Sequence, residues 1–246
     1  MPANNSSHGD EVIGIVHSCF QQKFGIPRQP RLAPAATAII ELFAPWNTMA
    51  CLQGLEACSH IWLLFRFHQH QHRTPSATVR PPRLGGNQRI GVFATRSSFR
   101  PNYIGMSAVR LLSISENRGK PTLHIAGIDV LDQTPLLDIK PYVPYSDSIA
   151  EAISPWQAPT DETRPSIEFS PQANEACRQI APQQPNFATL IVQLLRQDPR
   201  PAYHQQAERR YHMQLWQWDI HFYGSKTNIH VASITPQGAP PHESSH

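Results

Sequence analysis

The most constraining feature of the sequence is a series of short apolar runs, separated by turn residues, over its first 155 positions. The runs are rich in valine, isoleucine and phenylalanine, and they cover residues 11–18, 37–43, 60–67, 89–95, 107–115, 123–131 and 136–145. Between them, only residues 47–56 have the character of a short helix. The 24 prolines, against 12 glycines, also favour short elements with stiff connections. Many short strands at this spacing predict a mainly β fold with a closed or nearly closed barrel.

The composition changes near residue 155. Residues 156–170 are polar and rich in proline, which predicts a linker. Farther on, residues 187–197 have apolar residues at helical spacing, and we expect strands over 211–224 and 227–234. The sequence therefore predicts an N-terminal β-barrel-like domain over residues 10–155 and a small α+β C-terminal domain, a helix plus a hairpin, over residues 171–236.

Charge is distributed unevenly along the chain. The formal net charge is only +3, which is too small to indicate nucleic-acid binding by itself. However, no aspartate or glutamate occurs between Glu56 and Glu116, and eight arginines fall in that interval. Arginine is suited to bidentate contacts with phosphate or carboxylate groups. The interval is therefore a candidate anion-binding surface, and a solvated basic face is the alternative.

Several familiar signatures are missing from the sequence. It has no G-x-G-x-x-G after a strand, no G-x-x-x-x-G-K-[ST] and no G-x-S-x-G, which disfavours a doubly wound nucleotide-binding fold. The four cysteines form no C-x-x-C pair, so we expect neither structural zinc nor disulfides. The N-terminus lacks an apolar signal region, and no apolar run approaches the roughly 20 residues that span a bilayer. We therefore expect a cytoplasmic protein.

A histidine-rich stretch follows the third apolar run. His68, His70 and His72 are spaced at the period of a strand, which resembles one side of a metal site. No carboxylate or further cysteine or histidine cluster accompanies them, so a polar strand exit is favoured over a metal site.

A second polar cluster follows the turn sequence DQTP at residues 132–135. Strand alternation places Asp138, Lys140 and Tyr142 on one face of the expected strand. Three polar groups of different chemistry on one face form a candidate site, and a solvated outer face is the equal alternative.

Five motifs occur in order along the chain: KFGIPRQP (23–30), RPPRLGGN (80–87), GVFATRSSFRPNYIG (91–105), DVLDQTPLLDIKPYVPY (129–145) and QDPRPAY (197–203). In this combination the sequence resembles the TrmO family, whose members are also called YaeB or TsaA-like proteins. The resemblance implies a β-barrel methyltransferase that uses S-adenosylmethionine and forms homodimers. It also implies the substrate, which is the N6 nitrogen of threonylcarbamoyladenosine, just 3′ of the anticodon in tRNA.

The resemblance assigns roles to particular residues. It implies a cofactor site formed by Pro27, Arg28, Gln29, His68, Gln69, Arg96, Met106, Asp132, Gln133, Thr134 and Pro135. Arg100 would face tRNA phosphates, with Phe99 and Tyr103 placed to stack on bases of the anticodon loop.

Two positions depart from the family pattern. Tyr103 stands where the family usually has proline, and Gln133 stands where it usually has glycine. A glutamine is tolerable at the second position only if the turn avoids a positive φ.

The chemistry of the implied reaction suggests a catalytic group. A nitrogen that bears a carbamoyl group is a poor nucleophile, so alignment and removal of its proton are needed. We expect Asp138, Lys140 and Tyr142 to lie near the transfer. Two alternatives stay open: a tRNA-binding module without catalysis, and a barrel methyltransferase that acts on a small molecule.

Overall fold

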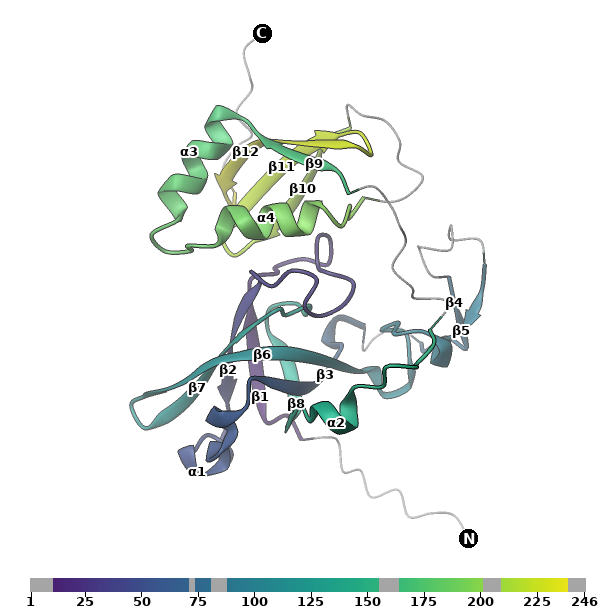
Figure 1. Ribbon diagram of the computed structural model, residues 1–246, viewed down its shortest axis with the longest axis vertical. Coiled ribbons are helices and arrows are strands. Elements are labelled where there is room, and N and C mark those ends of the chain that lie inside the picture. Colours follow the sequence, from purple (N-terminus) through teal and green to yellow (C-terminus); the bar gives the residue numbers. More distant parts are fainter. Residues whose placement is uncertain (1–10, 71–73, 81–87, 155–163, 201–208, 239–246) are drawn as a thin grey trace.

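The computed structural model describes residues 11–70, 74–80, 88–154, 164–200 and 209–238. Its first domain is a closed antiparallel barrel with the strand order β1-β2-β7-β6-β3-β8 (Figure 1). The barrel strands are β1 (Gly14–Ser18), β2 (Thr37–Leu42), β3 (His60–Arg66), β6 (Ile104–Asn117), β7 (Lys120–Ala126) and β8 (Thr134–Pro141). The predicted barrel is therefore confirmed.

The barrel interior is filled by apolar side chains. In β1, β2 and β3, buried and more exposed positions alternate, as expected for strands with one face toward a core. Each barrel strand contributes a fully buried side chain: Val16, Ile40, Leu63, Val109, Ile125 and Leu136. Burial of each such side chain stabilises the fold by about 1.5–3 kcal/mol.

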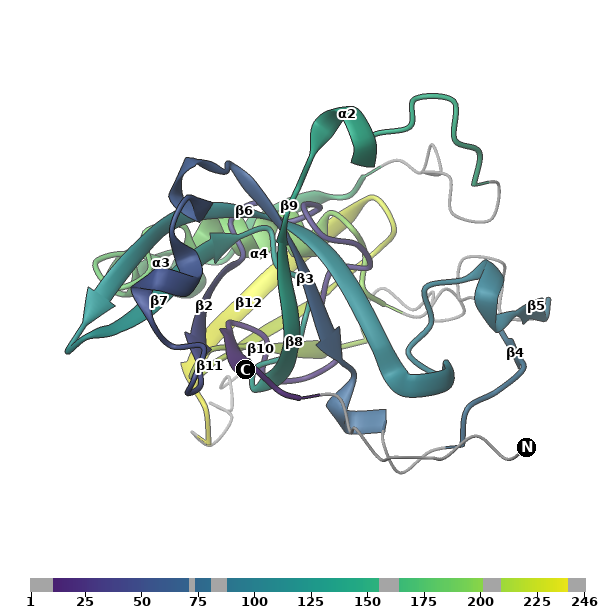
Figure 2. The ribbon, with the colours of Figure 1, turned by 90° about the horizontal axis from the view of Figure 1, so that it is seen from below.

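The predicted strand over residues 89–95 is wrong for most of its length. Only β5 (Ile90–Gly91) is extended, and it pairs with β4 (Thr78–Val79) in a small ribbon outside the barrel (Figure 2). The chain then turns into a 3-10 helix, η4 (Val92–Ala94). Because β3 pairs directly with β8, the barrel closes without this run. The side chain of Phe93 is left 77% exposed.

Other element ends also differ from the prediction. β7 ends at Ala126 rather than near residue 131, because Gly127 adopts a φ of +78° that breaks the strand. β8 is followed by the short helix α2 (Pro144–Asp147). The helix expected over residues 47–56 is divided at Gly54, which has a φ of +88°, into α1 (Met49–Leu52) and η1 (Leu55–Ala57).

The second domain is a four-stranded sheet with two helices. Its sheet has the order β10-β11-β12-β9. Its elements are β9 (Ser166–Phe169), α3 (Pro171–Ile180), α4 (Phe187–Leu195), β10 (Tyr211–Leu215), β11 (Trp218–Gly224) and β12 (Asn228–Pro236). β9 lies inside the stretch expected to be linker, so the sheet begins before residue 171. The strand expected over 211–224 is instead a hairpin, with a positive φ at Trp216.

The two domains share one apolar core. Phe20 bridges to Leu215, and the backbone N–H of Trp216 donates to the carbonyl of Cys19 at 2.8 Å. The ring of Phe24 stacks against Phe222, with ring centroids 6.2 Å apart. Residues 19–36, which we call the β1–β2 segment, are thus packed between the barrel and the C-terminal sheet. Within the described part of the chain, no helix is long and apolar enough to cross a membrane.

Candidate functional site

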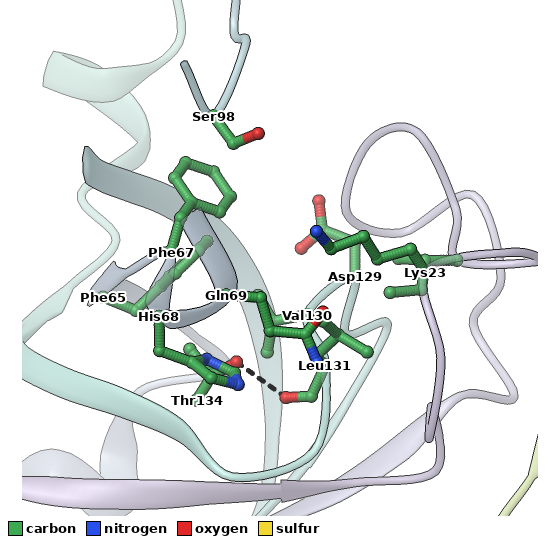
Figure 3. Close-up of a pocket in the computed structure, with 11 residues that line it drawn as sticks. Lys23, Phe65, Phe67, His68, Gln69, Ser98, Asp129, Val130, Leu131 and Thr134 are labelled. Carbon is green, nitrogen blue, oxygen red and sulfur yellow. Dashed lines mark hydrogen bonds between the residues drawn. The ribbon is translucent and has the colours of Figure 1, made fainter. Parts of the chain in front are cut away.

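Two adjoining hollows lie at the end of the barrel where β3 ends and β6 and β8 begin. The first has a cavity volume of about 200 Å³ and the second about 500 Å³. They share four lining residues, Phe65, Phe67, Ser98 and Asp129, so we treat them as two parts of one site. The β1–β2 segment, the end of β3, the loop after β5 and the connection from β7 to β8 supply the walls (Figure 3).

The second hollow collects predicted cofactor residues from three separate segments. Pro27, Arg28 and Gln29 come from the β1–β2 segment, Arg96 from the loop after η4, and Met106 from β6. The Nη1 atom of Arg96 donates to Oε1 of Gln29 at 2.6 Å. The structure therefore brings together residues that lie up to about 80 positions apart in the sequence.

The first hollow is lined by three of the other predicted cofactor residues, His68, Gln69 and Thr134. His68 belongs to a 3-10 turn, η2 (His68–His70), so the predicted strand spacing of the histidines is wrong. His72 lies outside the described residues. Burial and the charge of Lys23 lower the pKa of His68, which keeps its imidazole neutral at pH 7.

The turn at residues 132–135 lies beside the first hollow and contributes Thr134 to its lining. Asp132 accepts a hydrogen bond from the backbone N–H of Ser18 at 2.9 Å, which ties the turn to β1. Thr134 Oγ1 donates to the carbonyl of Leu131 at 2.7 Å. Asp132, Gln133 and Pro135 lie next to the lining residue Thr134 but do not line the hollow themselves.

Both departures from the family pattern fall on residues with a positive φ. Gln133 has a φ of +60°, so the turn does not avoid a positive φ. This conformation costs a residue with a Cβ about 1 kcal/mol or more. Tyr103 has a φ of +54°, which a proline cannot adopt because its ring fixes φ near −65°. The turn at Tyr103 therefore has a backbone shape that the usual proline would not permit.

Residues 92–103, which we call the arginine loop, also carry the predicted RNA contacts. Arg100 lines the second hollow, and its Nη1 atom donates to the carbonyl of Thr95 at 3.1 Å. Phe99 and Tyr103 are partly buried and do not line either hollow. The backbone N–H of Phe67 donates to the carbonyl of Tyr103 at 2.8 Å, which fixes the loop to the end of β3.

The predicted catalytic residues lie elsewhere. Asp138 and Lys140 form an ion pair at 3.1 Å on the exposed side of β8, with 44% and 62% of their side chains accessible. The ring of Tyr142 lies 5.5 Å from that of Trp62. None of the three predicted residues lines a hollow, and their catalytic role stays a prediction.

Sequence reasoning missed Asp129, which lines both hollows. Its Oδ1 atom accepts a hydrogen bond from Ser107 Oγ at 2.6 Å. Burial raises the pKa of Asp129 to about 6, although the Ser107 hydrogen bond and the charge of Arg96 oppose the rise. Figure 3 shows the Lys23 amine and the Asp129 carboxyl pointing toward one another. Gly127, just before it, was the available signal that the strand ends early.

The site combines cationic, apolar and anionic groups. Lys23, Arg28, Arg96 and Arg100 surround the single carboxylate that the described lining residues contain. Phe65 and Phe67 form an edge-to-face pair with centroids 5.3 Å apart. Such a lining suits an elongated ligand that has a carboxylate at one part and an aromatic group at another. The motif residues 81–87 and 201–203 lie outside the described residues.

Comparisons with known proteins cover nearly the whole chain. The profile of the tRNA-methyltransferase O N-terminal domain matches residues 15–148, and that of the TrmO C-terminal domain matches residues 162–237. A Pseudomonas aeruginosa protein named putative S-adenosylmethionine-dependent methyltransferase RcsF is 49% identical over 91% of this chain and 95% of its own. The Escherichia coli protein named tRNA (adenine(37)-N6)-methyltransferase is 37% identical over 94% of this chain and 100% of its own.

A solved structure shows the same architecture. The crystal structure of TrmO from P. aeruginosa superposes with a TM-score of 0.79 at 41% identity, over 95% of this chain and 99% of that one. Family profiles, full-length relatives and fold agree, and the chain belongs to the tRNA-methyltransferase O family.

Proposed function

We propose that the protein transfers a methyl group from S-adenosylmethionine to the N6 nitrogen of threonylcarbamoyladenosine at position 37 of tRNA, as the name of the E. coli relative indicates in part. The observation that carries the proposal is the convergence of Gln29, Arg96 and Met106 on one hollow at the barrel end. A tRNA substrate would place the protein in the cytoplasm.

The residues of the hollows fit the cofactor. Arg28 and Arg96 offer guanidinium groups for its carboxylate, and the apolar Met106 and Phe67 suit its adenine ring and aliphatic carbons. When bound, the cofactor supplies a methyl group on a positively charged sulfur. The chain's contribution is to hold the acceptor nitrogen in line with that group and to exclude water.

The arginine loop supports tRNA as the substrate. Arg96 and Arg100 lie beside the hollow, in a stretch of the sequence free of acidic residues. Cationic side chains around a site raise the local concentration of a polyanion and contact its phosphates. Phe99 and Tyr103 on the same loop are the proposed stacking partners for unpaired bases.

The threonylcarbamoyl group gives a physical reason for substrate choice. Its carboxylate is an anion for an arginine or for Lys140 to hold, and its carbamoyl N–H is more acidic than the amine of plain adenosine. Replacement of Lys140 by alanine should lower turnover more than tRNA affinity. If the Lys140→Ala variant turned over as fast as the parent protein, the Asp138–Lys140 pair would be a solvated surface pair without a catalytic role.

We also propose that the protein is a homodimer. Next to the second hollow, the side chains of Ile104 and Met106 are 37% and 50% exposed. Met106 pairs in register with Leu64, and Leu64 pairs with Asp138, so one continuous face joins the hollow to the proposed catalytic residues. A second copy on this face would shield the apolar groups and bring Asp138 into a closed site.

Light scattering tests the dimer with a matched pair of variants. Leu64→Lys places a charge on the proposed contact face, whereas Leu112→Lys places it on an exposed part of β6 beyond the pairing with β3. Only the first variant should shift the protein to the monomer mass. A monomeric parent protein, or dimers of both variants, would contradict the proposal.

Mass spectrometry of the anticodon-loop fragment tests the reaction itself. Purified protein and S-adenosylmethionine should methylate tRNA isolated with its threonylcarbamoyl group and leave an unmodified transcript unchanged. Equal methylation of both would show a general RNA methyltransferase. Binding of tRNA without methylation would favour the module without catalysis, and cofactor binding without tRNA binding would favour a small-molecule enzyme.

A further inference from the structure

Asp129 occupies a place in the site that the proposed cofactor and RNA contacts do not use. Asp129 lines both hollows, so a ligand that extends from one hollow to the other lies beside the Asp129 carboxyl. Ser107, which is 1% exposed, holds that carboxyl by a 2.6 Å hydrogen bond from within the barrel wall. A side chain positioned by a buried partner keeps its orientation when a ligand enters.

The proposed reaction needs a group that accepts a proton. The acceptor nitrogen carries one hydrogen, which must leave when the nitrogen gains a methyl group. A carboxylate within hydrogen-bond reach of that nitrogen can take it directly. Among the described residues that line the hollows, Asp129 is the only carboxylate.

We infer that Asp129 is the general base of the proposed methyl transfer and that Ser107 is its positioning residue; this inference rests on the proposed function. The N6 nitrogen forms a bond to the methyl carbon, and the electron pair of the carbon–sulfur bond stays on sulfur. The N6 proton passes to the Asp129 carboxylate. Release of that proton to water restores the carboxylate for the next turnover.

The electrostatic surroundings suit this role. A base works best when its pKa lies near the working pH, and burial raises the pKa of Asp129 to about 6. The charged and titratable groups that line the hollows with it come from three other segments: Lys23 and Arg28 from the β1–β2 segment, His68 from η2, and Arg96 and Arg100 from the arginine loop. Of these, the positive charge of Arg96 opposes the rise in pKa, and at neutral pH most of the carboxyl is ionised.

Two rival assignments define the controls. The carboxylate of Asp129 could instead bind the ammonium group of the cofactor, and in that case its loss would weaken cofactor binding. His68 lines the first hollow in its neutral form and is the other group there that could accept a proton. Asp129→Asn and His68→Gln keep the approximate size of each side chain and separate these cases.

The test combines calorimetry and single-turnover rates over a range of pH. Asp129→Asn should bind S-adenosylmethionine within about threefold of the parent and lose about 10²–10⁴-fold in rate. The parent rate should rise with pH to a plateau above about 6, and this rise should vanish in Asp129→Asn but persist in His68→Gln. Ser107→Ala removes a hydrogen bond that favours the charged carboxylate, so the rise should move to higher pH.

Carboxyl-carbon NMR on the cofactor-free protein gives a readout independent of activity. The Asp129 resonance should titrate near pH 6 in the parent and at higher pH in Ser107→Ala. Cofactor affinity that falls as far as the rate in Asp129→Asn, or a pH rise that vanishes in His68→Gln, would overturn the inference. A parent protein that methylates no tRNA would instead refute the proposed function, whatever the variants show.

Discussion

The barrel wall and the arginine loop are neighbours that are held in place by different interactions. The wall is formed by strands that pair with each other around a closed ring, and its inward side chains are fully buried. The loop forms no strand ladder with the barrel among the described residues. Individual hydrogen bonds fix it, such as that from Thr95 Oγ1 to the carbonyl of Val92 at 2.9 Å and that from the backbone N–H of Phe67 to the carbonyl of Tyr103 at 2.8 Å. We expect substitutions in the wall to change stability and substitutions in the loop to change binding.

A truncation in the wall should have the largest effect. Leu63→Ala leaves a cavity beneath a fully buried position and should lower the free energy of unfolding by about 2–5 kcal/mol. Phe93→Ser in the arginine loop should change it by less than about 0.5 kcal/mol, because that side chain is 77% exposed. Urea denaturation of both variants measures the difference, and equal losses would remove the distinction between the two regions.

Loss of Arg96 should have the next largest effect, on cofactor binding. Arg96→Ala removes a guanidinium group from the second hollow and should weaken S-adenosylmethionine binding by about 1.5–3 kcal/mol, which is about ten- to a hundredfold. Arg89→Ala is the control, because Arg89 directly precedes β5 and its Nη1 atom donates to Thr78 Oγ1 instead. Unchanged affinity in a folded Arg96→Ala protein would remove Arg96 from the site.

Asp129 lies between the two regions, and its effect on stability should depend on pH. The native pKa of about 6 is above the ordinary value of 3.8, so ionisation of the Asp129 carboxyl lowers the stability of the folded state. The resulting loss of stability is complete above pH 6 and absent below about pH 4. Asp129→Asn should therefore stabilise the protein by about 3 kcal/mol at pH 8 and hardly at pH 3.5. A gain of the same size at both pH values would contradict this reasoning.

Arg100→Ala should have the smallest effect on binding. Removal of one phosphate contact should weaken tRNA binding a few-fold and reduce the slope of log affinity against log salt by about 1. Cofactor affinity should fall less than in Arg96→Ala. An unchanged salt slope would show that Arg100 serves mainly to fix the loop, through its hydrogen bond to Thr95.

The barrel was predictable from sequence because the residue types within each strand reflect which of its faces is buried. Short apolar runs such as residues 37–43 predicted strands, and in the structure one face of β2 is buried. The run at 89–95 has similar composition, but whether it joins the barrel depends on the pairing of β3 with β8, which no local pattern encodes. β9 was missed for the same reason, because it pairs in parallel with the distant β12.

The site was predictable only in part. The sequence predicted a cationic surface over the arginine loop, and the resemblance supplied the predicted cofactor residues that meet in the second hollow. Asp129 was missed because its run reads as a strand, and the positive φ of Gly127 that ends β7 is a backbone property. The positive φ of Gln133 could not be read either, because glutamine rarely adopts it.

The position of the β1–β2 segment bears on when the site is completed during protein synthesis. The Gln22 side chain donates to the carbonyl of His212, which is 190 residues farther along the chain. At a translation rate of about 5–20 residues per second, this segment is synthesised about 10–40 seconds before β10, the strand that it contacts. The loop that bears Pro27–Gln29 thus receives its last packing partner only near the end of translation, so the proposed cofactor site is completed after all the barrel strands have been synthesised.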